Sequence, residues 1–126
     1  MRAALARYSH VDRQGLIEGS SPVGVVRLLF DELARQLERL ANAEAQADRS
    51  ARGDAVSRAI SIVLALEGSL DFDNGGDIAR NLARLYDWLR RTLVSSLSAP
   101  NAESLALARR VIGDLSGAWN QVGAAR

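Results

Sequence analysis

Apolar residues recur every three or four positions in four separate stretches of the chain, the spacing of amphipathic helices. The first stretch follows Ser21-Pro22, a helix start in which serine caps free N–H groups and proline takes the first helical position. We expect this helix to end near Asp48. Its apolar stripe consists of Val26, Phe30, Leu33, Leu37 and Leu40.

The second stretch is apolar around most of its circumference. We expect it to start at Asp54 as N-cap, after a polar loop over 48–53, and to end near Leu70. One face carries Val56, Ile60, Val63 and Leu70, and a second carries Ala55, Ala59, Ile62 and Leu66. Such a helix is central in its bundle, is covered by another segment, or keeps one face for a partner.

The last two stretches begin at recognisable turns. Asn74-Gly75-Gly76 accepts positive φ, and Asp77 then suits the N-terminus of a new helix. The stripe of this third helix is Ile78, Leu82, Leu85, Leu89 and Leu93. The fourth helix follows Asn101 as a cap, with a stripe of Leu105, Ala108, Ile112, Leu115, Trp119 and Val122.

Four helices with short connections predict an all-α, antiparallel up-down-up-down four-helix bundle. We assign the bundle to 21–122, a partly flexible N-terminal arm or short extra helix to 1–20, and a frayed tail to 123–126. Glycines at 15 and 19 discourage a long helix in the arm. Its apolar residues should dock on the bundle or on a partner.

The composition indicates an ordinary globular domain. The chain has 126 residues, of which 48% are hydrophobic and 25% charged, with no cysteine. It lacks an apolar run of about 20 residues and a signal-like N-terminus, so we expect a cytoplasmic protein without membrane insertion. Sixteen arginines are interleaved with fifteen acids for a net charge of +1, which argues against nucleic-acid binding.

Catalytic and metal-binding constellations are missing from the sequence. The single histidine, His10, lies in the irregular arm, and the chain has no Gly-x-Ser-x-Gly elbow and no lysine for a phosphate-binding loop. A calcium loop starting at Asp71 would place Gly75 and Leu82 where oxygen ligands belong. We therefore expect no catalytic residue, no metal site, no cofactor and no enzymatic activity.

One segment resembles a known family. Asn81, Leu82, Leu85, Tyr86 and Trp88 follow the Asn-Leu-x-x-Leu-Tyr-x-aromatic signature of the flagellar secretion chaperones, the FliS family. The resemblance extends over about residues 8 to 122. It also includes Ser69-Leu70-Asp71, Gly75-Gly76-x-Ile78-Ala79, Ser20-Ser21-Pro22, Leu29-Phe30-Asp31, Tyr8 and Trp119, although Phe30 stands where the family usually has tyrosine.

The resemblance implies a non-enzymatic cytoplasmic chaperone. Such a protein binds the disordered C-terminal segment of flagellin, prevents premature polymerisation and presents the subunit to the flagellar type III export gate. The resemblance also implies that Asn81, Leu82, Tyr86 and Trp119 belong to the family's fold signature. We expect the free protein to be a monomer or weak dimer.

A disordered guest that gains helix on binding must bury its apolar face in a groove. We expect one groove along Ile62, Leu66, Leu85 and Trp88, with Tyr8, Val11 and Ile17 as a displaceable cover. The alternative is a self-associating structural bundle that uses its spare apolar face as a homodimer interface. A small-ligand or enzymatic bundle is a third possibility.

Overall fold

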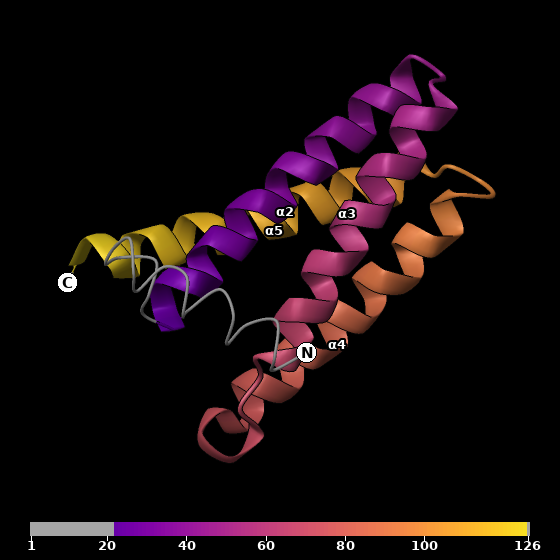
Figure 1. Ribbon diagram of the computed structural model, residues 1–126. Coiled ribbons are helices and arrows are strands. Elements are labelled where there is room, and N and C mark those ends of the chain that lie inside the picture. The colour runs from indigo at the N-terminus through magenta and orange to yellow at the C-terminus, as the bar shows by residue number, and fades with distance from the viewer. Residues whose placement is uncertain (1–21, 126) are drawn as a thin grey trace.

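The computed structural model describes residues 22–125 of the chain, with side chains from Gly24 to Gln121. This range contains no strand and consists of α2 (Pro22–Ala45), α3 (Arg49–Gly68), α4 (Phe72–Ser96) and α5 (Ala102–Ala125). Successive helices run in opposite directions (Figure 1), which confirms the predicted all-α bundle. The expected arm lies outside the described residues, and α5 continues into the segment expected to be a frayed tail.

The connection between α2 and α3 is shorter than expected. Ala47 adopts a φ of 54°, and the side chain of Asp48 accepts a hydrogen bond from the backbone N–H of Ala51 at 3.0 Å. The N-cap is therefore Asp48, and the expected start at Asp54 is wrong. The first turn of α3 carries no large apolar residue, so the hydrophobic pattern did not mark it.

Helix α4 begins before the glycine turn rather than after it. Asp71 is its N-cap, and the Asp71 side chain accepts a hydrogen bond from the backbone N–H of Asn74 at 3.2 Å. Gly76 then interrupts the helix with φ 52° and ψ −125°. The expected break at the glycines is thus found inside α4, where Gly76 separates a short first segment from the helical segment that begins near Asp77 and carries the Ile78 stripe.

Helix α3 lies between α2 and α4, which explains its apolar circumference. Helix α2 packs against both α3 and α5, and α3 packs in addition against α4. Helices α4 and α5 make few contacts and diverge from their connection in Figure 1. The largest fully buried side chains are Phe30, Leu33, Leu37, Leu40, Val56, Val63, Leu66, Tyr86, Leu89 and Ile112.

Three aromatic residues join three helices in the core. Phe30 of α2 lies 6.4 Å from Tyr86 of α4 and 6.3 Å from Trp119 of α5, measured between ring centroids. Burial, and secondarily the negative charge of Glu67, raise the pKa of the Tyr86 hydroxyl well above its usual value. Tyr86 therefore stays neutral and acts as a packing residue.

Replacement of Gly76 by alanine should destabilise the protein by about 1–3 kcal/mol, because Gly76 has a conformation that a side chain strains. Gly113 is the matched control: it lies inside α5, where an added Cβ meets nothing within 4 Å. Gly113→Ala should stabilise the protein by about 0.4–1 kcal/mol. Urea denaturation measures both; equal shifts for the two variants would contradict the assigned role of Gly76.

Candidate partner-binding site

An apolar groove lies between α4 and α5 near the start of α4. Its volume is about 400 Å³. Ile78 is the most exposed large hydrophobic side chain among the described residues, at 72%, whereas Leu82 and Leu85 are half-buried. The complete lining is Ile78, Asn81, Leu82, Leu85, Val111, Asp114 and Leu115.

A second hollow, of about 290 Å³, lies between the same two helices near their connection. Apolar side chains of α2, α4 and α5 form its apolar part: Leu37, Leu40, Leu89, Leu93, Leu105 and Ala108. Hydroxyl and amide groups at its rim come from Thr92, Ser95, Ser96, Asn101 and Ser104. The Asn101 side chain accepts a hydrogen bond from the backbone N–H of Ser104 at 3.0 Å, which confirms the predicted cap of α5.

These two hollows occur where the bundle is least closed, because α4 and α5 make few contacts. From Ile78 to Ser96, α4 rises about 27 Å at 1.5 Å per residue. A guest helix of about 18 residues has the same length. An amphipathic helix of that length lying along α4 would reach both hollows with its apolar face.

A third groove, of about 560 Å³, runs between α2 and α3. Its apolar end is formed by Val25, Leu28, Leu29 and Ile62. Leu28 is 48% exposed, although it is a large hydrophobic residue. The polar end is formed by Glu32, Arg35, Gln36, Ser57, Arg58 and Ser61. This groove can hold an apolar segment at one end and charged groups at the other.

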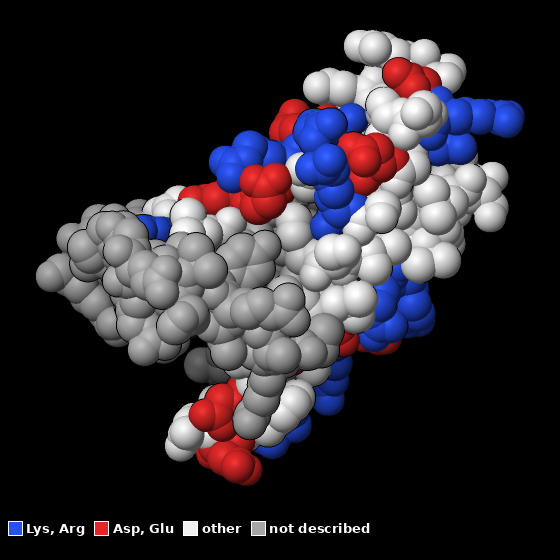
Figure 2. Space-filling view, viewed as in Figure 1, with Lys and Arg blue, Asp and Glu red and all other residues white. Residues whose placement is uncertain are grey.

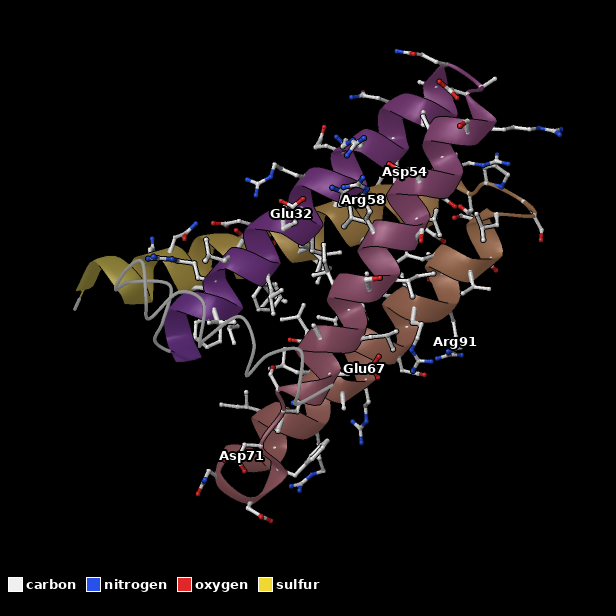
Figure 3. The ribbon with its side chains drawn as sticks, in the orientation of Figure 1. Glu32, Asp54, Arg58, Glu67, Asp71 and Arg91 are labelled. Atoms are coloured by element: carbon white, nitrogen blue, oxygen red, sulfur yellow. The ribbon has the colours of Figure 1, made fainter. Side chains whose placement is uncertain are left out.

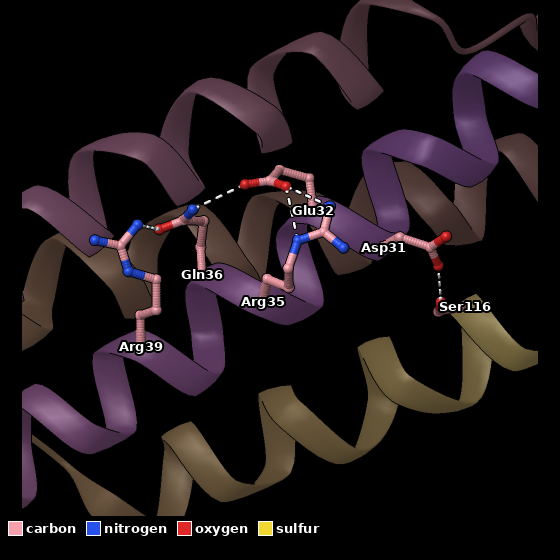
Figure 4. Close-up of polar contacts among 6 residues, drawn as sticks. All are labelled: Asp31, Glu32, Arg35, Gln36, Arg39 and Ser116. Carbon is pink, nitrogen blue, oxygen red and sulfur yellow. Dashed lines mark hydrogen bonds and ion pairs between the residues drawn. The ribbon is translucent and has the colours of Figure 1, made fainter. Parts of the chain in front are cut away.

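Arginines lie beside acids at the polar end of this groove. Figure 3 shows Glu32, Asp54 and Arg58 close together on the face formed by α2 and α3. Glu32 accepts hydrogen bonds from Gln36 and Arg35, both at 2.9 Å (Figure 4). These bonds, the one from Gln36 first, hold the pKa of the Glu32 carboxyl below its usual range. Asp54 pairs with Arg58 at 3.2 Å and with Arg39 at 3.6 Å.

Other polar contacts join helices outside the three grooves. The Ser116 hydroxyl of α5 donates to Asp31 of α2 at 2.5 Å (Figure 4). Arg90 of α4 pairs with Glu67 of α3 at 3.1 Å. On the face shown in Figure 2, the described arginines are interspersed with acids rather than gathered into one basic patch.

The residues expected to share one groove lie in different places. Ile62 lines the α2–α3 groove and Leu85 lines the α4–α5 groove, while Trp88 is half-buried against the core and lines none of the three hollows. Leu66 has no exposed surface. Its placement on a binding surface is corrected, because the Leu66 side chain belongs to the buried core. Tyr8, Val11 and Ile17 lie outside the described residues.

The fold-signature residues divide between core and groove. Tyr86 is buried and Trp119 packs against the core, whereas Asn81 and Leu82 line the α4–α5 groove. The groove residues that the sequence did not predict include Ile78, Val111 and Leu28. Val111 and Leu28 fall outside the apolar stripes of their helices, a signal that could have identified them. Ile78 belongs to its stripe and carried no such signal.

Two negative findings apply to residues 22–125. No helix there has the length and hydropathy needed to cross a bilayer. The described side chains also include no group of three or more histidine, cysteine, aspartate or glutamate residues that could hold a metal ion.

A sequence profile of the family described as "Flagellar protein FliS" matches residues 4–126, almost the whole chain. The chain belongs to the FliS family. A flagellar secretion chaperone FliS of Salmonella typhimurium is 30% identical over 121 residues, covering 95% of this chain and 90% of the relative. The Vibrio cholerae chaperone of the same name is 28% identical, over 97% of this chain and 90% of its own length.

A third relative, flagellar secretion chaperone FliSB of Pseudomonas aeruginosa, is 26% identical and aligns over 94% of both chains. Because the matches to FliS relatives span nearly the full chain, they include both α4 and α5 and therefore the groove between them. Membership of this family supports a role in flagellar export as a chaperone, which is a non-enzymatic kind of protein.

Proposed function

We propose that the protein binds the disordered C-terminal segment of flagellin and holds it in the grooves of the bundle. The main supporting observation is the α4–α5 groove, where Ile78 is left 72% exposed beside Leu82, Leu85, Val111 and Leu115. Burying such apolar surface stabilises a complex by roughly 25 cal/mol per Å² before ordering costs. A bound segment could not join a filament, and the complex could be presented to the type III export gate from the cytoplasm.

We further propose that Ile62, Leu85 and Trp88 contribute to guest binding from separate surfaces, and that Tyr8, Val11 and Ile17 form a displaceable cover. The separation of Ile62 and Leu85 between two grooves favours a guest that contacts more than one face of the bundle. Removal of residues 1–20 should then raise guest affinity. The free protein should be a monomer or weak dimer, which light scattering at several concentrations measures.

Isothermal titration of the full chain with a flagellin C-terminal peptide tests this function. We expect one-to-one binding, a negative heat-capacity change from apolar burial, and a gain of helix in the peptide by circular dichroism. Absence of binding heat at two temperatures, together with unchanged helix content, would reject the proposal. Concentration-dependent dimerisation that masks the α4–α5 groove would instead favour the structural homodimer.

A further inference from the structure

The α4–α5 groove and the α2–α3 groove carry charged residues of opposite sign. In the α4–α5 groove, Asp114 is the one charged residue among the described lining residues. Asp114 makes no hydrogen bond or ion pair with another residue that the structure describes. In the α2–α3 groove, the charged lining residues are two arginines, Arg35 and Arg58, and one acid, Glu32.

The acids beside the α2–α3 groove already have partners. Glu32 accepts hydrogen bonds from Arg35 and Gln36. Asp54 pairs with both Arg39 and Arg58. The side chains of Arg35 and Arg58 are nevertheless 65% and 60% exposed. Three arginines, Arg35, Arg39 and Arg58, stand against two acids, Glu32 and Asp54, so the net charge at this polar end is positive. The exposed guanidinium groups also keep N–H donors for a further partner.

We infer that this opposite charge sorts the segments of a guest between the two grooves. A segment with a basic residue beside its apolar ridge lies between α4 and α5, where that residue pairs with Asp114. A segment with an acidic residue at the same position lies between α2 and α3, where that residue pairs with Arg35 or Arg58. This inference rests on the proposed function, and it adds the chemistry of the guest and the order in which the guest lies on the bundle.

Charge of this kind contributes more to specificity than to affinity. Exposed ion pairs change affinity by only about two- to fivefold, and salt screens them over about 8–10 Å. A wrongly placed segment loses its pair and also faces a like charge. The apolar contacts therefore supply most of the binding, and the charges determine which groove each segment occupies.

Two designed peptides test whether charge sorts segments between the grooves. Each has about 18 residues, the length of a helix that spans α4 from Ile78 to Ser96. Both carry the same leucine ridge; one is flanked by lysines and the other by glutamates. Each is added at low salt to the full chain labelled with ¹⁵N. We expect the lysine peptide to shift amide signals around Leu82 and Val111, and the glutamate peptide to shift those around Leu28 and Ile62.

Single substitutions assign these effects to side chains. Asp114→Asn should weaken the lysine peptide about two- to fivefold and leave the glutamate peptide unchanged, and Arg58→Gln should do the reverse. The matched controls are Asp73→Asn and Arg84→Gln, because both residues are exposed and line none of the three grooves.

Three outcomes would overturn the inference: both peptides bind in the same groove, either peptide fails to bind, or all variants have equal effects. The flagellin titration separates the two proposals, because binding of that segment without sorting leaves the proposed function intact.

Discussion

Replacing Ile78 with aspartate should weaken binding of the flagellin C-terminal segment by about tenfold or more. Full burial of an isoleucine side chain contributes about 1.5–3 kcal/mol, and a carboxylate in an apolar contact adds a desolvation cost. Ile78 is 72% exposed in the free protein. The free energy of unfolding should therefore change by no more than about 0.5 kcal/mol. Calorimetric titration and urea denaturation measure the two quantities.

Val94→Asp is the matched control for this substitution. Val94 is a β-branched residue on the same helix, is 52% exposed, and lines none of the three described hollows. Because a carboxylate is unfavourable near a helix C-terminus, Val94→Asp should lower stability at least as much as Ile78→Asp, yet it should not weaken guest binding. If both variants lose the same affinity for the flagellin segment, the loss comes from a change in α4 as a whole. That result would contradict guest binding in the groove at Ile78.

Replacing Leu66 with alanine should lower the free energy of unfolding by about 2–5 kcal/mol, because it leaves a cavity in a closed core. Leu66 is 0% exposed and belongs to the core cluster to which all four helices contribute. Thermal and urea denaturation of the same sample measure this loss.

Leu64→Ala provides the comparison two residues away on the same helix. Leu64 is 37% exposed and lies outside the core cluster, so its truncation should change stability by no more than about 0.5 kcal/mol. Should Leu66→Ala leave stability unchanged and weaken guest binding instead, the original placement of Leu66 on the binding surface would be right.

Local signals were sufficient to predict the helices and one cap. Phe30, Leu33 and Leu37 follow one face of α2 and are all buried, as their spacing predicts. Asn101 caps α5 because its side chain accepts a hydrogen bond within the first turn, which depends on neighbouring residues alone. The start of α3 was missed because Asp48 and Asp54 are equally plausible caps by residue type.

The groove could not be predicted because it depends on how distant helices cross. Ile78 and Leu89 belong to the same stripe of α4, yet Ile78 is 72% exposed and Leu89 is 0% exposed. The difference arises because α4 and α5 diverge, a relation between segments that no local pattern encodes. Local patterns also led to the wrong prediction that Ile62 and Leu85 share one groove. In the structure the two residues line different grooves.

Methyl NMR of the full chain, with and without the flagellin C-terminal segment, tests most directly whether the bundle offers its inter-helix grooves to a guest. We expect shifted methyl signals for Ile78, Leu82, Val111 and Leu115, and unchanged signals for Val94. Perturbation confined to Val94 and Leu64, with the groove methyl groups unaffected at saturation, would contradict this expectation.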